Sequence, residues 1–308
     1  MQCTKDLGVL IAGGAGLLGV NWAILKRHKY YITLGLHTRN ISIDGVATRA
    51  MNLLSTEAIE NVINFVKPDI VINAAALSSV ELCELNIGLA QELNIDGAIN
   101  LSVTCKKHDI PFVHISTDHL FSGENEMVAE DQKTSPLNNY GYSKALAEEK
   151  VLEVNPDALV IRTNFYGWGT TYRQSFSDVI VTSLREDRHL GLFSDVFYTP
   201  IVIERLVDII HELVDCEARG IFHVVGDDRV SKYEFGVLLA KYFGFSGQKL
   251  LPISIMDKKN LVKRPHDLSL SNKKVTKFLS KRIGGITEHL HLLKNQHDSC
   301  KYLEIIKL

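Results

Sequence analysis

Tyr140 and Lys144 have the residue types and the spacing of a proton-transfer pair. Asn138 or Asn139, just before Tyr140, can cap a helix, and residues four apart on a helix share a face. We therefore expect the Tyr140 phenol beside the Lys144 ammonium, whereas Tyr142 is not one turn from Lys144. A free tyrosine has a pKa of about 10, and we expect the ammonium to lower the pKa of Tyr140 until it can act as a general acid. Taken alone, the same spacing also suits an ordinary helix with a solvated lysine.

A glycine-rich turn near the start of the chain predicts a dinucleotide-binding site. Leu7–Ala12 is a short apolar run typical of a buried parallel strand, and Val20–His28 has the apolar spacing of a helix. The glycines between them permit a tight turn and let backbone amides at the helix start approach a pyrophosphate. The residues expected to touch the cofactor here are Gly13, Gly16, Leu17, Leu18 and Gly19.

The second expected strand, Tyr31–Leu36, is followed by a sequence that favours NADPH over NADH. An NAD site usually has an acidic residue here for the ribose hydroxyls, and none occurs before Asp44. Thr38 and Arg39 instead offer a hydroxyl and a cation to a 2′-phosphate. NADP(H) is therefore the preferred cofactor, with NAD(H) as the second choice. The alternative for Arg39 is a solvated loop position.

Strands and helices alternate along the next part of the chain, which predicts an α/β fold with a parallel sheet. We expect a helix at 56–66, a strand at 68–73, a helix at 89–108 and a strand at 112–116. Small residues after a strand let the backbone lie against a flat cofactor, and the first of these strands leads into Ala74, Ala75 and Ala76. Thr117 and Asp118 follow the later strand, where a hydroxyl can hold a substrate carbonyl beside Tyr140. Helix capping is the alternative for both.

Length, charge and composition limit the class of protein. A chain of 308 residues with 45% hydrophobic and 23% charged residues suits one large α/β unit or two joined ones. The formal net charge of −2 gives no electrostatic case for a nucleic acid or an anionic membrane as partner. No apolar run approaches the roughly 20 residues of a membrane span, and the five scattered cysteines form no CxxC pair. We expect a cytoplasmic protein with reduced cysteines.

Taken together and in order, these motifs resemble those of the extended short-chain dehydrogenase/reductase superfamily. Within it the chain looks like the dTDP-4-dehydrorhamnose reductase family and related nucleotide-sugar 4-keto reductases. The resemblance covers roughly residues 5–295. It rests on GGAGLLG at 13–19, INAAALSSVELCE at 72–84, LNIDGAINL at 93–101, HISTDHLFSG at 114–123, PLNNYGYSK at 136–144, IRTNFYGWG at 161–169 and KRPHDLSLSNKK at 263–274.

The resemblance implies a Rossmann-type doubly wound parallel sheet with a smaller, discontinuous C-terminal substrate domain. The cofactor domain would take residues 1–165 and about 196–230, and the substrate domain 166–195 and 231–295. The tail at 296–308 lies beyond the resemblance and has no assigned role. A homodimer is expected from the family alone.

The resemblance also implies roles for side chains. Tyr140 would protonate the new alkoxide at the sugar C4, and Lys144 would tune Tyr140 and hold the nicotinamide ribose. Thr117 would hydrogen-bond the carbonyl oxygen, with Asp118 beside it. The remaining implied contacts are with the cofactor at Asn52 and Leu53, and with a nucleotide-diphosphate sugar at Val80, His119, Phe165 and Arg264. Arg264 would face the diphosphate, and a surface ion pair is the alternative.

Three positions depart from the family pattern. His119 stands where a tyrosine is common, Phe165 where a tryptophan is common in rhamnose-pathway reductases, and Asn52 where an aspartate often contacts the adenine. The first two lie near the expected sugar, so the substrate can differ from dTDP-4-dehydrorhamnose itself. For His119 both a second proton donor and a packing histidine stay open.

The predicted function is NADPH-dependent reduction of the C4 keto group of a nucleotide-activated 4-keto-6-deoxy sugar in deoxysugar biosynthesis. Two alternatives stay open. One is a nucleotide-sugar epimerase with tightly bound NAD; the other is a non-catalytic NADP-binding regulatory subunit, as in the beta subunit of methionine adenosyltransferase. No metal is expected, because no standard site has the spacing of His289, His291 and His297.

Overall fold

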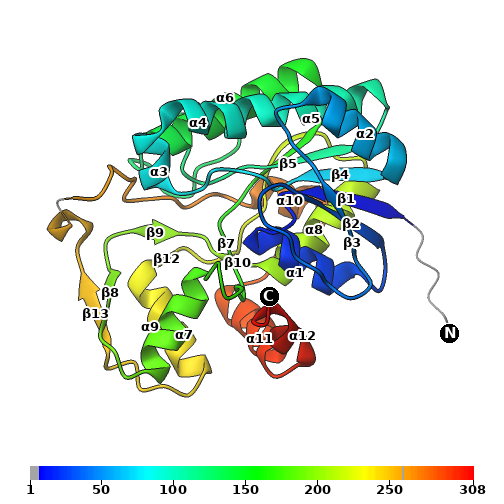
Figure 1. Ribbon diagram of the computed structural model, residues 1–308. Helices are drawn as coiled ribbons and strands as arrows, with labels where there is room; N and C mark the ends of the chain where they lie inside the picture. The colour runs from blue at the N-terminus through cyan, green and yellow to red at the C-terminus, as the bar shows by residue number, and fades with distance from the viewer. Residues whose placement is uncertain (1–6, 259) are drawn as a thin grey trace.

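The chain folds around a seven-stranded sheet in which every pair of neighbouring strands is parallel (Figure 1). The computed structural model describes residues 7–258 and 260–308. The strands lie in the order β11-β6-β5-β4-β1-β2-β3. Their bounds are β1 Gly8–Ala12, β2 Tyr31–Leu36, β3 Ala47–Ala50, β4 Ile70–Asn73, β5 Phe112–Ile115, β6 Leu159–Arg162 and β11 Gly220–His223. The predicted Rossmann-type, doubly wound fold class is confirmed.

The strand β1 shows why the inner strands of this sheet have apolar residues on both faces. Alternate residues of a strand point to opposite faces of the sheet. Val9 and Ile11 belong to one hydrophobic core and Leu10 and Ala12 to another, and none of the four is more than 1% exposed. Because helices cover both faces, neither face needs polar residues.

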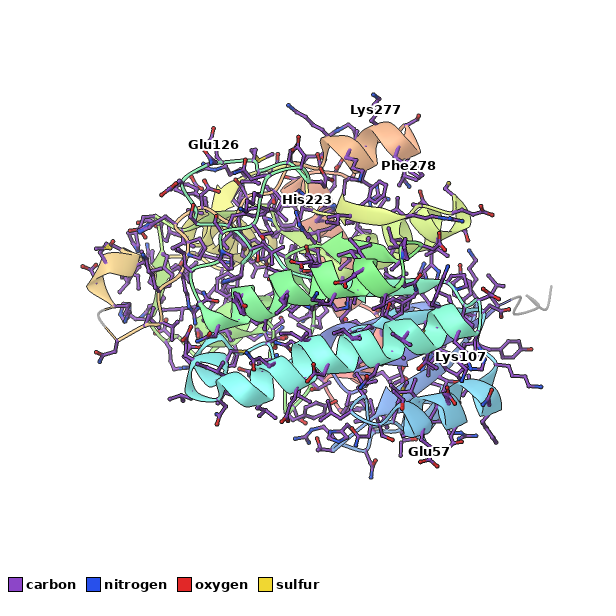
Figure 2. The ribbon with its side chains drawn as sticks, turned by 90° about the horizontal axis from the view of Figure 1, so that it is seen from above. Glu57, Lys107, Glu126, His223, Lys277 and Phe278 are labelled. Atoms are coloured by element: carbon purple, nitrogen blue, oxygen red, sulfur yellow. The ribbon has the colours of Figure 1, made fainter. Side chains whose placement is uncertain are left out.

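The helices that form the two outer layers differ in which core they bury. On one face α2 (Thr56–Val66), α5 (Gly97–Lys107) and α6 (Asn139–Val154) pack together, and Figure 2 shows α5 and α6 side by side with α2 beyond α5. On the other face lie α1 (Leu17–Lys26) and α8 (Ile203–Asp215) (Figure 1). The amino ends of α1 and α6 bring the glycine turn and the Tyr–Lys pair to the same cavity, described below.

The strand order reverses at β1, which lies between β2 and β4. In open parallel sheets, ligands bind beyond the carboxyl ends of the strands at such a point. Gly13 follows β1 and Ala74 follows β4, and the backbone N–H of Ala74 donates to the carbonyl of Ala12 at 3.0 Å. The glycine turn and the three alanines therefore meet at this edge of the sheet.

A smaller group of elements lies apart from the main sheet, at the lower left of Figure 1. There β8 (Leu190–Phe193) pairs in parallel with β13 (Leu250–Ile253), and α7 (Phe176–Arg185) and α9 (Lys232–Tyr242) pack beside them. Short two-stranded pieces join this group to the rest: β7 Phe165–Tyr166 with β10 Ile201–Val202, and β9 Phe197–Tyr198 with β12 Val230–Ser231. The division of the chain into a cofactor domain and a substrate domain at the expected residues stays a prediction.

The remaining helices are short, except for one of twelve residues near the end of the chain. They are α3 Val80–Leu85, α4 Ile87–Gln91, a π-helix η1 Glu92–Asp96, a 3-10 helix η2 Ile255–Asp257, α10 Lys273–Leu279, α11 Ile286–His297 and α12 Cys300–Ile305. No described helix is both long and apolar enough to cross a membrane. The carboxyl-terminal tail, which had no expected place, packs against α1. Glu304 of α12 forms an ion pair with Arg27 at the end of α1, and the Tyr302 ring lies 4.9 Å from that of Trp168.

The expected strand at 31–36 and the expected helix at 56–66 are confirmed at those bounds. The single helix expected at 89–108 is instead three consecutive segments, α4, η1 and α5. Asn94 lies in the π-helical segment, where its side chain bonds the backbone N–H of Leu77 at 2.7 Å and the Ser143 hydroxyl at 2.9 Å. π-helical segments are rare and are often found at functional sites. Here the segment places Asn94 so that it connects the loop after β4 to α6.

Candidate active site

Tyr140 and Lys144 lie one turn apart on α6 and line one cavity of about 360 Å³. Of the two candidate caps, Asn138 is the one used: its side-chain oxygen accepts a hydrogen bond from the Gly141 N–H at 2.9 Å. Tyr142 is 52% exposed and does not line the cavity. The helix therefore presents the expected tyrosine and lysine, and not their neighbour, to the site.

Lys144 is a buried cation with few partners. It is 2% exposed, and its Nζ lies 2.8 Å from the carbonyl oxygen of Ile115 and 3.1 Å from Nε2 of His114. Burial lowers the pKa of Lys144 to about 8, and the charge of Glu148, one turn later on α6, partly opposes this. Lys144 is therefore charged in most molecules at neutral pH but is close to its titration point.

The pKa of Tyr140 moves in the direction opposite to the prediction. Burial, the largest cause, raises it to about 12, and the charge of Asp118 raises it further, while a hydrogen bond with Thr117 lowers it. The expected lowering by Lys144 is wrong for the protein without bound ligands. The phenolate would lose its hydration in the protein interior, and the Lys144 amine is directed at Ile115 and His114 instead. Tyr140 is thus held as a protonated phenol.

Thr117, Asp118 and His119 follow β5 and surround Tyr140 from the side away from the cofactor cavity. Thr117 and Asp118 are 5% and 2% exposed, and Asn164 donates a hydrogen bond from its side-chain nitrogen to Asp118. The His119 ring packs edge-on against the Tyr140 ring with centroids 5.6 Å apart. Burial lowers the pKa of His119, and its Nδ1 has no hydrogen-bond partner among the described residues. None of the three lines the cofactor cavity.

Backbone of the glycine turn forms one wall of the cavity. Gly13 has φ +78°, and a Cβ there would lie 2.6 Å from the backbone nitrogen of Ala75 on the opposite wall, so only glycine fits. A Cβ on Gly19 would lie 2.8 Å from Cα of Gly14, which makes Gly19 a packing residue and not part of the wall. The other residues expected to contact the cofactor on these two walls do line the cavity. They are Gly16, Leu17, Leu18, Ala74, Ala75 and Ala76.

The far end of the cavity carries the expected selectivity residues. Thr38, Arg39, Asn52 and Leu53 all line it. Arg39 forms no ion pair in the described part of the chain, and its guanidinium carbon lies 4.0 Å from the centre of the Tyr172 ring. The positive charge of Arg39 is therefore available to a 2′-phosphate on an adenosine ribose bound at this end of the cavity.

The further cavity residues that sequence reasoning missed include Ser78, Leu93 and Arg173. Arg173 donates a hydrogen bond to the Ser78 hydroxyl at 2.6 Å, and next to it Tyr172 donates to the carbonyl of Ala15 at 3.0 Å. Residues 170–173 thus form a strap that contacts both rims of the cavity. No sequence signal marks them, because the expected motif ends at residue 169 and the contacts form only in the folded chain.

The expected substrate residues have different positions. Phe165 lines the cofactor cavity, and Val80 is buried at the start of α3. Arg264 forms an ion pair with Glu81 of α3, and its Nε is buried without a hydrogen-bond partner among the described residues. The ion-pair alternative for Arg264 is thus present in the structure, and it does not exclude a diphosphate at the remaining donors.

Lys232, at the start of α9, is a second cation near these residues that sequence reasoning missed. Its Nζ lies 3.3 Å from the centre of the Tyr198 ring, and burial lowers its pKa to about 8. The charge of Asp118 partly opposes that lowering, while Arg264 adds to it. The one available signal was its place directly after Ser231, the helix cap.

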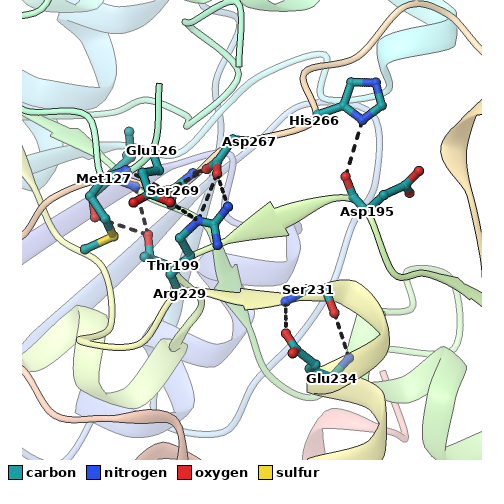
Figure 3. A network of polar contacts seen from close by, with 11 residues as sticks. Glu126, Met127, Asp195, Thr199, Arg229, Ser231, Glu234, His266, Asp267 and Ser269 are labelled. Atoms are coloured by element: carbon teal, nitrogen blue, oxygen red, sulfur yellow. Dashed lines mark hydrogen bonds and ion pairs between the residues drawn. The ribbon is translucent and has the colours of Figure 1, made fainter. Parts of the chain in front are cut away.

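The segment that follows Arg264 is held by the network in Figure 3. Asp267 accepts hydrogen bonds from Arg229 at 2.8 Å and from the Ser269 backbone N–H at 2.8 Å, and the Ser269 hydroxyl accepts from the Met127 N–H at 2.7 Å. Asp267 is 8% exposed. These bonds fix the strand-like segment 266–271 against β9, β12 and the loop after β5.

The cavity fits a dinucleotide. The turn at Gly13 leaves no room for a side chain between the two walls, and residues at the start of α1, where helix amides can bind a pyrophosphate, line the space. The Ser116 hydroxyl, on the cavity wall, has no hydrogen-bond partner among the described residues and is available to a ligand. Among the residues that the structure describes, no group of three histidine, cysteine or acidic side chains is placed to hold a metal ion.

Comparisons with known proteins agree on one family. The family described as "RmlD substrate binding domain" matches residues 7–296. The probable low-salt glycan biosynthesis reductase Agl14 of Haloferax volcanii is 30% identical over 239 residues, 76% of this chain and 79% of that protein. The dTDP-4-dehydrorhamnose reductase of Aggregatibacter actinomycetemcomitans is 27% identical over 285 residues, 87% of this chain and 91% of that protein.

Two more comparisons bear on function and fold. The methionine adenosyltransferase 2 subunit beta of Mus musculus is 28% identical over 257 residues, 80% of this chain and 75% of that protein. The crystal structure of dTDP-4-dehydrorhamnose reductase from Bacillus anthracis in complex with NADP has a TM-score of 0.83 at 22% identity and covers 94% of this chain and 99% of that one. At that identity the likeness supports the fold.

Proposed function

Because this chain belongs to the RmlD substrate binding domain family, we propose that it reduces the C4 keto group of a nucleotide-activated 4-keto-6-deoxy sugar with NADPH, in deoxysugar biosynthesis. It is an NAD(P)-dependent oxidoreductase by kinship with proteins named as reductases of such sugars. The observation that carries the proposal is the position of Tyr140 and Lys144 on the wall of the cavity that the glycine turn forms. That arrangement brings a proton donor to a dinucleotide site.

The residues around Tyr140 support a reduction in which the protein donates one proton to the substrate. NADPH, when bound, supplies the hydride to C4. The Tyr140 phenol donates its proton to the oxygen at C4 as that oxygen gains charge, and burial keeps the phenol protonated until then. The Thr117 hydroxyl, which hydrogen-bonds Tyr140, orients the same oxygen. Lys144 lies on the same helix face and lines the cavity, where its amine would hold the nicotinamide ribose.

The end of the cavity at Arg39 supports a preference for NADPH, with NADH accepted less well. A 2′-phosphate there would meet the Thr38 hydroxyl and a guanidinium, which binds phosphate with two hydrogen bonds. Relatives of known structure include a reductase bound to NADP and an enzyme bound to NAD. The first-turn amides of Leu17 and Leu18 would hold the pyrophosphate, and Asn52 and Leu53 the adenine.

The sugar nucleotide would occupy the side of Tyr140 away from the cofactor. His119, which packs on Tyr140, and Phe165 would contact the sugar, together with Val80 at the start of α3. A diphosphate would compete with Glu81 for Arg264, and Lys232 offers a second positive charge nearby. His119 and Phe165 replace larger or phenolic side chains common in rhamnose-pathway enzymes, so the preferred sugar can differ from dTDP-4-dehydrorhamnose.

The cellular setting and assembly are part of the same proposal. We expect a cytoplasmic homodimer, with the cofactor domain at 1–165 and about 196–230 and the substrate domain at 166–195 and 231–295. Exposed apolar side chains on α3, α4 and α6 support an interface there, and they include Leu82, Leu85, Ile87, Leu89 and Tyr142. The thiols of Cys83, Cys105 and Cys216 are free, in keeping with a reducing compartment, while Cys3 lies outside the described residues.

A second candidate, a regulatory subunit that binds NADP without turnover, is favoured by the likeness to methionine adenosyltransferase subunit beta. Retention of Thr117, Tyr140 and Lys144 favours catalysis, since a scaffold has no need of a proton donor. The test is NADPH oxidation by purified protein offered 4-keto-6-deoxy sugars as dTDP, GDP and UDP forms. Turnover on one of them supports the reductase. Tight NADPH binding with no turnover, together with capture of an adenosyltransferase, supports the regulatory subunit, and co-purified NAD would point to an epimerase.

A further inference from the structure

Lys144 is one end of a chain of hydrogen bonds that runs through the protein interior to the wall of the cofactor cavity. Its Nζ lies 3.1 Å from Nε2 of His114, and Nδ1 of His114 lies 3.2 Å from the side-chain nitrogen of Asn73. The side-chain oxygen of Asn73 accepts a hydrogen bond from the backbone N–H of Ala75, also at 3.2 Å. Lys144, His114 and Asn73 are 2%, 0% and 1% exposed, so they have one another and not solvent as partners.

The direction of each bond follows from the chemistry of the groups. The Ala75 N–H only donates, so the Asn73 atom that faces it is the oxygen, and the Asn73 amide nitrogen faces His114. Nδ1 of His114 must then accept, and in a neutral imidazole the other nitrogen, Nε2, carries the hydrogen. That hydrogen points at Lys144, whose nitrogen can accept it only as an uncharged amine.

A protonated Lys144 requires the opposite arrangement. An ammonium has three hydrogens and no lone pair, so Nε2 of His114 has to accept, and the single ring hydrogen has to sit on Nδ1. The Asn73 amide must then turn its oxygen to His114 and give up the hydrogen bond from Ala75. The two states differ by one proton, and the added charge resides on Lys144.

We propose that His114 is a positioning residue for Lys144 and that it changes tautomer when Lys144 gains or loses its proton. The imidazole serves both states of the lysine, as an acceptor for the ammonium and as a donor to the amine. An apolar side chain can do neither. Through Asn73 the charge of Lys144 is also coupled to the backbone of Ala75, on the wall of the cofactor cavity. The inference rests on the proposed function only for the role of Lys144 in the reaction.

Few charged groups act on this pair. Glu148, on α6, favours the ammonium against the effect of burial, and it is held in turn by Arg162 at 2.7 Å. Burial and the nearby charge of Lys144 hold the pKa of His114 well below its usual value, so the ring is neutral in both states. Tyr140, on the same face of α6, keeps its proton because its pKa is raised to about 12. The strands beside His114 present Asn73 and apolar residues to it.

The direct test is the tautomer of His114 in the intact protein. We would label the histidines with ¹⁵N and record two-bond ¹H–¹⁵N spectra between about pH 6.5 and 9.5, with the His114 signals assigned from a His114→Gln sample. The expected result is hydrogen on Nδ1 at the acid end and on Nε2 at the alkaline end, with a midpoint near the pKa of Lys144, about 8. His289, buried and bonded to the Ile283 carbonyl, is the internal control and should not change.

Two outcomes overturn the proposal: one tautomer across the whole range, or a doubly protonated ring at the acid end. The variant Lys144→Met separates the effect of the lysine from that of the ring, because it removes the titrating amine. In that variant we expect hydrogen on Nε2 at every pH, since Asn73 still donates to Nδ1. A tautomer change that persists in Lys144→Met would show that another group drives it.

A kinetic measurement tests the positioning role. In His114→Leu the buried ammonium loses an acceptor, whereas the amine loses only a donor, so the pKa of Lys144 should fall further. We expect the alkaline limb of the profile of kcat against pH to shift to lower pH by about one unit. His289→Leu removes an equally buried imidazole from α11 and should leave the limb in place. An unmoved limb in His114→Leu contradicts the positioning role. Failure to turn over any sugar would refute the proposed function and leave the tautomer result standing.

Discussion

The guanidinium of Arg39 lies over the ring of Tyr172, with 4.0 Å between the guanidinium carbon and the ring centre. The hydroxyl of the same tyrosine donates to the carbonyl of Ala15 in the glycine turn, at 3.0 Å. Residues from three distant parts of the chain are thereby held together at the end of the cavity where a 2′-phosphate would bind. We propose that a preference for NADPH depends on this arrangement.

The substitution Arg39→Ala should weaken the binding of NADPH and leave the binding of NADH nearly unchanged. A charge-assisted pair of hydrogen bonds to a phosphate contributes about 1.5–3 kcal/mol, so we expect a loss of about 10- to 100-fold in NADPH affinity. Fluorescence titration with each nucleotide measures this. Arg49→Ala is the matched control, because Arg49 also lies over an aromatic ring, that of Phe65, but does not line the cavity. Equal losses for NADPH and NADH would remove Arg39 from phosphate recognition.

Substitutions of Arg264 and Glu81 should change the KM for the sugar nucleotide in opposite directions. Loss of the guanidinium in Arg264→Ala should raise KM about tenfold or more with little change in kcat, since the diphosphate is remote from C4. Glu81→Gln removes the competing carboxylate. The pair is partly exposed, with side chains 27% and 45% accessible, so its release should lower KM by at most about fivefold. Steady-state kinetics of both variants decide the matter, and a KM unchanged in Arg264→Ala would place the diphosphate elsewhere.

We expect the buried charge of Lys144 to lower the free energy of unfolding at neutral pH. Its pKa in the folded chain is about 8, below that of an unfolded lysine, so the unfolded chain binds more protons between those two values. The cost is therefore full below about pH 8 and disappears as the pH rises to about 10.5. We expect Lys144→Met to stabilise the protein by about 2–3 kcal/mol at pH 7, less the hydrogen bonds it loses, and by much less at pH 9.5.

Urea unfolding at the two pH values measures this difference. Lys150→Met is the matched control, because Lys150 lies on the same helix, is partly exposed and pairs with Glu153. Its effect should stay within about 0.5 kcal/mol at both pH values. A stabilisation by Lys144→Met that is the same at pH 7 and pH 9.5 would show that packing, and not the buried charge, is responsible.

Much of the fold could be predicted because its signals are local. β2 has apolar residues at successive positions and α2 has them at helical spacing, and both elements have the expected bounds. The turn at Gly13 was predicted for the same reason: a glycine-rich run between a strand and a helix has few uses. The π-helical segment at Glu92–Asp96 could not be predicted, since it depends on contacts of Asn94 with Leu77 and Ser143.

The candidate site shows the same division. The expected cofactor residues, from Gly13 to Lys144, line one cavity except for Gly19, because each of their motifs is contiguous in sequence. Tyr172, Arg173 and Lys232 were missed, since each reaches the site through tertiary contacts. The sign of the Tyr140 pKa shift was wrong because spacing on a helix gives the distance to a lysine but not the burial of the phenol.

We propose that Tyr140 gives the proton that completes the reduction. The most direct test compares Tyr140→Phe with Tyr142→Phe, which removes a hydroxyl two residues away on the exposed side of the same helix. With the best sugar nucleotide as substrate, we predict that Tyr140→Phe lowers kcat by about 10²- to 10⁴-fold and leaves NADPH affinity nearly intact, while Tyr142→Phe retains full turnover. Turnover by Tyr140→Phe at the wild-type rate would contradict the account.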